Sequence, residues 1–222
     1  MKTKDPVNQG LIEHEINSGF EKIGLMNSKV WSEDPKRLIF TLSRYKFVSK
    51  MFNGFDSVLE IGCGDGFGSK VVNQTVKNLT ISDYDPLFIE RFNSDFNTKS
   101  DIKAVTHDFL EKEFSEPFDA IYSLDVLEHI HPEKEDLFLT NCVKSLKKDG
   151  VLIFGMPSLE SQLYASPESK EGHVNCKSGN DFKECMEKYF KNVFLFSMND
   201  EVIHTGFEKM AHYLFTLCVG KS

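Results

Sequence analysis

The chain has 222 residues, of which 40% are hydrophobic, and a net charge of −8 from 26 Lys and Arg against 34 Asp and Glu. This size and composition suit one domain with a substantial core, and the acidic balance without a basic stripe argues against a nucleic-acid partner. No run reaches the roughly 18 consecutive apolar residues of a membrane helix, the N-terminus lacks the apolar stretch of a signal peptide, and the five cysteines show neither metal nor disulfide spacing. We therefore expect a cytoplasmic protein that acts away from membranes.

Two regions are distinguished along the chain. Residues 1–35 form an extension of unknown role, and residues 36–222 read as one domain in which strand-length apolar runs alternate with helical periodicity. Such alternation predicts an α/β fold, a parallel sheet with helices on both faces. In chain order the expected elements are a helix at 35–52, a strand at 56–61, a helix at 66–76, a strand at 78–82, a helix at 86–96, strands at 102–106 and 118–123, a helix at 133–147, a strand at 150–155, a helix at 179–189 and strands at 193–199 and 211–219.

A stretch at about 157–178 interrupts this pattern. It is rich in Ser, Pro, Glu and Gly and has little periodicity, which is typical of a surface loop. We expect it to form a lid or part of an acceptor pocket.

The most informative segment lies at the end of the first strand. There an apolar run carries Glu60, and three glycines follow at alternate positions, Gly62, Gly64 and Gly66. Glycine lets a ligand approach the backbone closely, and open α/β sheets bind ligands at the carboxyl ends of their strands. A dinucleotide fingerprint would need a third glycine at the sixth position of the motif, and counting from Gly62 that position is Phe67. An NAD-dependent oxidoreductase is therefore the weaker interpretation.

Three later strands also end in polar residues. Asp83 closes the second strand, 21 residues after Gly62, near the distance at which an acid holds a ribose hydroxyl pair. Asp108 and Phe109 follow the third strand, and the run Asp125-Val-Leu-Glu-His129 follows the fourth. Isolated turns and caps have no reason to fall at successive strand ends in this order.

Together the four segments resemble the motifs of class I S-adenosylmethionine-dependent methyltransferases, over about residues 36–220. The pattern around the fourth strand is closest to the quinone-biosynthesis-like small-molecule O-methyltransferases. The resemblance implies a seven-stranded, mostly parallel Rossmann-like sheet in the order 3-2-1-4-5-7-6. It also implies S-adenosylmethionine as cofactor, with S-adenosylhomocysteine as product, and a small-molecule acceptor methylated on oxygen or nitrogen. Identity of the acceptor and oligomeric state are left open.

The same resemblance carries roles to individual residues. Asp83 would bind the ribose and Tyr84 would lie beside the adenine, while Glu60 would orient the glycine loop and the amino end of the methionine. Arg44, on the helix before the first strand, would pair with the methionyl carboxylate. The full set of expected cofactor contacts is Arg44, Glu60, Gly62, Cys63, Gly64, Gly66, Asp83, Tyr84, Asp108, Phe109, Ser123 and Leu124.

Two histidines are the expected catalytic residues. A hydroxyl or protonated amine must lose a proton before or during transfer, and histidine is the usual base. We expect His173 to be the base and His129 to contact the cofactor or acceptor, with no metal ion. In one alternative, Asp125, Glu128, His129 and His173 bind Mg²⁺ or Mn²⁺ as in metal-dependent 2′-O-methyltransferases. In another, the chain binds the cofactor without catalysis.

Overall fold

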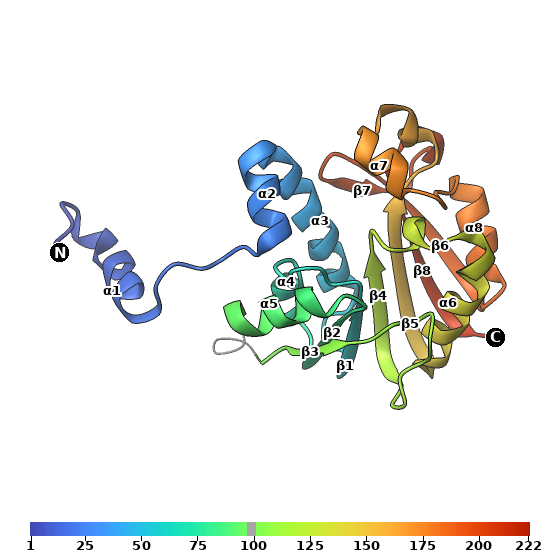
Figure 1. Ribbon diagram of the computed structural model, residues 1–222, viewed down its shortest axis with the longest axis horizontal. Helices are drawn as coiled ribbons and strands as arrows, with labels where there is room; N and C mark the ends of the chain where they lie inside the picture. Colours follow the sequence, from blue (N-terminus) through green and yellow to red (C-terminus); the bar gives the residue numbers. More distant parts are fainter. Residues whose placement is uncertain (97–100) are drawn as a thin grey trace.

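The computed structural model describes residues 1–96 and 101–222 (Figure 1). Its centre is a mixed eight-stranded sheet in the order β3-β2-β1-β4-β5-β8-β6-β7. Strands β1 to β5 pair in parallel, and β8 runs antiparallel to both β5 and β6. The strands are β1 Ser57–Ile61, β2 Asn78–Asp83, β3 Lys103–Thr106, β4 Phe118–Leu124, β5 Leu146–Pro157, β6 Phe190–Asn199, β7 Val202–His204 and β8 Tyr213–Lys221.

Helices cover both faces of this sheet and begin at residues suited to that position. Pro35 and Pro132 open α3 and α6, where the missing N–H of proline costs nothing, and the Ser178 side chain caps α8. The α-helices are α1 Gln9–Ser18, α2 Leu25–Glu33, α3 Pro35–Met51, α4 Ser69–Asn73, α5 Pro86–Phe96, α6 Pro132–Lys144, α7 Pro167–Gly172 and α8 Gly179–Glu187; the 3-10 helices are η1 Pro6–Asn8, η2 Leu127–His129, η3 Glu160–Tyr164 and η4 Glu208–Met210.

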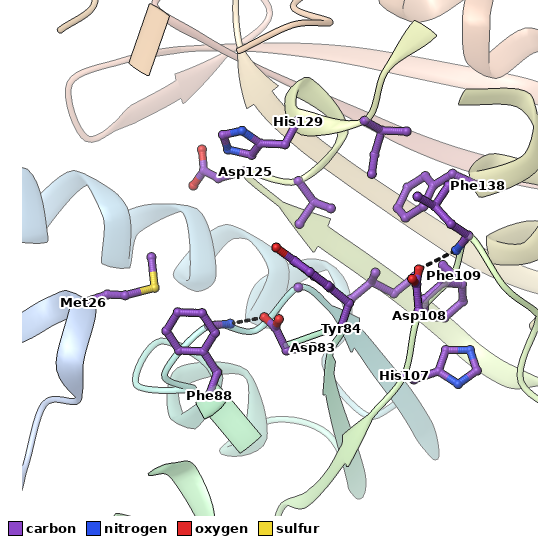
Figure 2. Close-up of a pocket in the computed structure, with 16 residues that line it drawn as sticks. Met26, Asp83, Tyr84, Phe88, His107, Asp108, Phe109, Asp125, His129 and Phe138 are labelled. Carbon is purple, nitrogen blue, oxygen red and sulfur yellow. Dashed lines mark hydrogen bonds between the residues drawn. The ribbon is translucent and has the colours of Figure 1, made fainter. Parts of the chain in front are cut away.

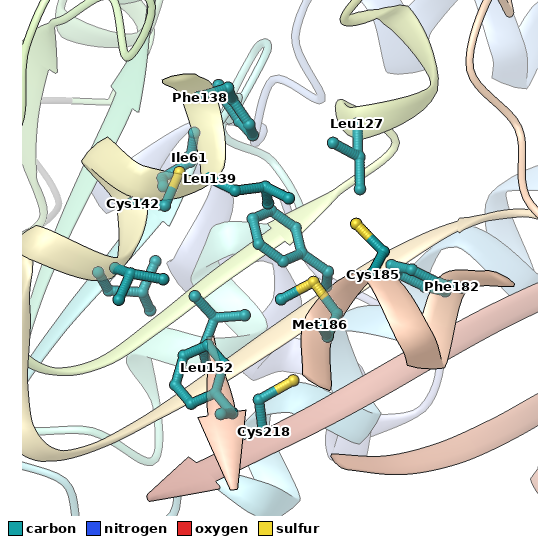
Figure 3. Close-up of a cluster of buried hydrophobic side chains, with 14 of the residues drawn as sticks. Ile61, Leu127, Phe138, Leu139, Cys142, Leu152, Phe182, Cys185, Met186 and Cys218 are labelled. Carbon is teal, nitrogen blue, oxygen red and sulfur yellow. The ribbon is translucent and has the colours of Figure 1, made fainter. Parts of the chain in front are cut away.

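Two apolar cores hold the layers together. On one face, side chains of α3, α4 and α5 such as Val48, Val72 and Phe92 are fully buried against the sheet. On the other, α6 and α8 pack onto β4, β5 and β8; Figure 3 shows Leu139 of α6 and Met186 of α8 in this core. Burial on both faces explains why the central strands are near-continuous apolar runs.

The sheet brings the polar strand ends to one edge. Ile61 pairs with Ser82 of β2 and with Ser123 of β4, and Asp83 pairs with Thr106 of β3. Because these strands are parallel and in close register, the segments that follow them meet at the same carboxyl edge.

The predicted α/β class and strand order are confirmed for seven strands, with β8 as the inserted antiparallel strand. The eighth, β7, was not predicted; it is a three-residue edge strand paired with β6, too short to give a pattern. The helix expected at 66–76 is reduced to α4, and the stretch at 157–178 contains η3 and α7. Among the described residues, no helix combines the length and apolarity needed to cross a bilayer.

The first 35 residues contain two α-helices. In Figure 1, α1 stands away from the sheet and is joined by an extended stretch to α2, which lies beside α3. No side chain of α1 is buried. The extension therefore approaches the domain through α2 and the residues just before it.

Candidate functional site

A cavity of about 580 Å³ lies among the segments that follow β1, β2, β3 and β4 (Figure 2). This volume falls in the range of roughly 300–1,000 Å³ that is common for small-molecule sites. Its lining residues are Met26, Ile61, Gly62, Gly64, Asp83, Tyr84, Phe88, His107, Asp108, Phe109, Leu110, Asp125, Val126, His129, Ile130 and Phe138. All four segments singled out in the sequence therefore line one cavity.

The glycine loop is fixed to the end of β2 by Asp83. Gly64 N–H donates to Asp83 Oδ2 at 2.9 Å, and Asp85 N–H donates to Asp83 Oδ1 at 3.0 Å. Burial raises the pKa of Asp83, and the hydrogen bonds from Asp85 and Gly64 oppose that shift. A carboxylate has about four acceptor positions, so Asp83 can still accept hydrogen bonds from a hydroxyl pair in the cavity.

The gap between the glycine loop and α2 exists because position 64 has no side chain. Gly64 has a φ of 53°, and a Cβ there would lie 2.8 Å from Met26 Sδ. A side chain at this position would close the gap between the loop backbone and α2. The loop thus presents bare backbone to the cavity, so a ligand can approach it closely.

The opposite end of the cavity is aromatic and acidic. Asp108 Oδ1 accepts a hydrogen bond from Leu110 N–H at 2.7 Å, which leaves its other oxygen available. Phe109 is buried against His107, with ring centroids 4.7 Å apart. Tyr84 also lines the cavity, yet 73% of it is exposed. These residues suit a flat heteroaromatic ring with an exocyclic amino group.

Glu60 lies behind the loop and does not line the cavity. Its carboxylate accepts hydrogen bonds from Ser69 Oγ, at the start of α4, and from Tyr122 Oη at 2.7 Å. Burial raises the pKa of Glu60 to about 7, against the effect of these two hydrogen bonds. Its position lets it orient the loop, and its contact with the amino end of a methionine stays a prediction. Five other expected contacts also lie outside the lining residues: Arg44, Cys63, Gly66, Ser123 and Leu124.

Arg44 is occupied by a different partner from the one expected. Its Nη1 lies 2.6 Å from Asp125 Oδ2, and its guanidinium stacks over the ring of Tyr213 at 3.8 Å from the centroid. Asp125 has a φ of 57°, unusual for a residue other than glycine. Arg44 therefore holds Asp125 at the cavity wall and does not itself line the cavity.

The two expected catalytic histidines lie together. Their ring centroids are 5.1 Å apart; His129 lines the cavity, and His173 lies beside it at the end of α7. Val174 N–H and Asn175 N–H donate to the Glu128 carbonyl at 2.8 and 3.0 Å, which joins the segment after β4 to the segment after β5. The two predicted histidines therefore lie at one site, although they are 44 positions apart in the chain.

The hydrogen bonds of these two rings indicate which ring nitrogen carries the proton. His173 Nδ1 lies 2.8 Å from Gln162 Oε1, and His129 Nδ1 lies 2.9 Å from the Gly172 carbonyl. Both partners are oxygens that can only accept, so each Nδ1 is assigned the proton. Burial, followed by the neighbouring His129, lowers the pKa of His173. His173 is therefore neutral near pH 7, with Nε2 able to accept a proton.

Glu128 adds a buried carboxyl next to these rings. It is fully buried, and neither of its oxygens has a hydrogen-bond partner among the described residues. Burial and the nearby Asp125 raise the pKa of Glu128 well above its ordinary value. Ligand atoms of Glu128, His129 and His173 lie within 4.8 Å of one another, a spacing compatible with a metal ion.

The central part of the chain is similar to a known protein family. Residues 59–154 match the family model described as a methyltransferase domain. The segment begins in β1 and ends in β5, so it includes all four strand ends that line the cavity.

Relatives extend the likeness beyond this segment. Nodulation protein S of Bradyrhizobium diazoefficiens is 30% identical over 138 residues, which cover 59% of this chain and 66% of that protein. The match thus spans slightly less than two thirds of this relative's length. The structure of the N-methyltransferase NodS from Bradyrhizobium japonicum WM9, in complex with S-adenosyl-L-homocysteine, is similar with a TM-score of 0.66, 19% identity, and coverage of 97% of this chain and 99% of that one.

A second solved structure has the same fold. The methyltransferase domain of bacterial CtHen1-C is similar with a TM-score of 0.68 and 14% identity, over 82% of this chain and 100% of that one. These likenesses, together with the strand order, place the chain in the class I methyltransferase fold.

Several residues that line the cavity were not predicted as cofactor contacts. Val126 and Ile130 flank the predicted Glu128-His129 pair, and their place beside a strand end could have indicated them. Met26 lies 38 residues before Gly64 in a segment with no recognisable pattern. Its position depends on how α2 packs, which no local signal reveals. The remaining unpredicted lining residues are Ile61, Phe88, His107, Leu110, Asp125 and Phe138.

Proposed function

We propose that the protein transfers a methyl group from S-adenosylmethionine to an oxygen or nitrogen of a small-molecule acceptor. The observation that carries the proposal is the convergence of the glycine loop, Asp83, Asp108 and His129 on one cavity. Nodulation protein S, a partial relative, and the N-methyltransferase NodS, similar in fold, support the same class of reaction. The likeness to quinone-biosynthesis O-methyltransferases stays a prediction.

The chain's contribution to this reaction is mainly positional. S-adenosylmethionine supplies an already activated methyl group, so the protein has to align the donor with the acceptor. Asp83 and the Gly64 backbone hold one side of the cofactor, and Asp108 with Phe109 holds the aromatic end. His129 borders the cavity where an acceptor would enter, and His173 is the nearby neutral base. Its Nε2 takes the proton that the acceptor loses.

Methyl transfer is tested with S-adenosylmethionine labelled in the methyl group. The purified protein is incubated with a metabolite extract from which macromolecules have been removed, and products are separated by chromatography. We expect label in a small molecule, with none in the same extract incubated without protein. Binding of S-adenosylhomocysteine together with no transfer to any acceptor would contradict the proposal and favour the non-catalytic alternative.

The spacing of Glu128, His129 and His173 is the observation that supports the metal-dependent alternative. One feature weighs against it: the Arg44 guanidinium already brings a positive charge to Asp125. We therefore expect the transfer rate to be unchanged after treatment with EDTA. Loss of activity that Mg²⁺ or Mn²⁺ restores would support the alternative.

A further inference from the structure

The segment from Gly19 to Glu33, called the N-terminal cover below, is attached to the glycine loop through one buried side chain. Asn27 N–H donates to Asp65 Oδ2 at 3.0 Å, and Asn27 Nδ2 donates to Asp65 Oδ1 at 2.7 Å. Asp65 is only 4% exposed and lies between two loop glycines, but it does not line the cavity. Its carboxylate therefore holds the cover.

Close packing makes this attachment specific. Gly24 has a φ of 82°, and a Cβ there would lie 2.4 Å from Asp65 Cγ. The backbone of the cover is thus pressed against the side chain that anchors it. A residue with a side chain at position 24 would force the two apart.

Two ion pairs add to the contact. Lys22 Nζ lies 2.6 Å from Asp95 Oδ1, and Lys70 Nζ lies 2.8 Å from Glu21 Oε2. The side chain of Lys22 is largely exposed, and exposed pairs contribute little because water screens them. The buried contact between Asn27 and Asp65 is therefore the main attachment.

The cover places one side chain at the cavity. Met26, next to the anchor residue Asn27, is the one residue of positions 1–35 among those that line the cavity, although 51% of it is exposed. In Figure 2 it approaches from α2, on the side of the cavity where Phe88 lies. A half-exposed thioether at the wall of a cavity gains apolar contact when a ligand fills the space.

We propose that the N-terminal cover closes over the bound cofactor, with Met26 in contact with the cofactor and Asn27 and Asp65 as positioning residues. This inference rests on S-adenosylmethionine being the cofactor. Asp65 lies in the middle of the glycine motif, and the motif alone does not indicate its role. In this proposal Asp65 joins the glycine loop, which binds the cofactor, to the N-terminal cover, which retains the cofactor.

The full-length variant Gly24→Ala tests the proposal, with Gly19→Ala as the matched control. Gly19 also has a positive φ, of 69°, but a Cβ there would meet nothing within 4 Å. Both substitutions strain the backbone, and Gly24→Ala alone displaces the cover from Asp65. We expect Gly24→Ala to bind S-adenosylhomocysteine about tenfold more weakly than the wild type, which is the effect of losing one hydrogen bond to a charged group. Its dissociation rate should be higher by a similar factor. The secondary-structure content without ligand, measured by far-ultraviolet circular dichroism, should match that of Gly19→Ala.

Two further variants, Asn27→Ala and Met26→Ala, alter the partly exposed cover without a change in the domain core, and both are expected to increase the dissociation rate of S-adenosylhomocysteine. Equal affinity and dissociation rate in all variants and in the wild type would overturn the proposal. If the wild type fails to bind S-adenosylhomocysteine, the proposed function itself is wrong, so the two failures are distinguishable by calorimetry.

Discussion

Replacing Asp83 with alanine is expected to weaken the binding of S-adenosylhomocysteine by about 100-fold or more. The variant removes the acceptors for two hydroxyl groups, each hydrogen bond to a charged group being worth roughly 1.5–3 kcal/mol, and a tenfold change in affinity corresponds to about 1.4 kcal/mol. It also frees Gly64 N–H, which donates to Asp83 Oδ2 at 2.9 Å in the wild type. Isothermal titration calorimetry measures the change directly.

Asp85→Ala is the matched control for this prediction. Asp85 lies two residues further on, and its Oδ1 accepts a hydrogen bond from Leu87 N–H at the start of α5, but it does not line the cavity. We expect its affinity for S-adenosylhomocysteine to stay close to that of the wild type. Equal affinities of Asp83→Ala and the wild type would exclude Asp83 from the cofactor site.

His173→Ala is expected to lower turnover by about 100-fold, a typical contribution of a general base, while the affinity for S-adenosylhomocysteine is retained. The reason is that His173 lies beside His129 and not among the residues that line the cavity. It can take a proton from an acceptor without holding the cofactor. Turnover is measured with the acceptor found in the labelling experiment.

The pH dependence of turnover provides a second test of His173 as the base. Burial and the neighbouring His129 lower its pKa, so the neutral, basic form persists below the ordinary histidine value of about 6.5. The acidic limb of the turnover profile should therefore lie below that value and should disappear in His173→Ala. His131→Ala, which alters an exposed histidine at the start of α6, should leave turnover and profile unchanged. Unchanged turnover in His173→Ala would exclude it as the base.

The parts of the fold and site that could be predicted are those encoded locally. Buried strands give apolar runs, and the acids at their ends follow directly in the chain, so the sequence alone assigns Asp83 and Asp108 to one sheet edge. His129 was found in the same way. These residues line the cavity because the carboxyl ends of parallel strands in register lie at the same edge of the sheet.

Other features depend on contacts between distant segments, which leave no local pattern. Arg44 was correctly placed on the helix before β1, but its choice of Asp125 as partner follows from how α3 packs against the end of β4. Met26 reaches the cavity because Asn27 binds Asp65, 38 residues away. The buried position of Glu60 likewise follows from Ser69 and Tyr122 closing around it. These contacts join residues that are separated by unrelated numbers of positions in the chain, so no sequence pattern predicts them.

The most direct test is calorimetry of the wild-type protein with S-adenosylhomocysteine and, separately, with NAD. Gly62, Gly64 and Asp83 would serve either a nucleoside or a dinucleotide, whereas Phe67 stands where a dinucleotide fingerprint needs glycine. We expect saturable binding of S-adenosylhomocysteine at one site per chain and no measurable binding of NAD. Tight binding of NAD, with none of S-adenosylhomocysteine, would contradict the assignment of this cavity to a methyl donor.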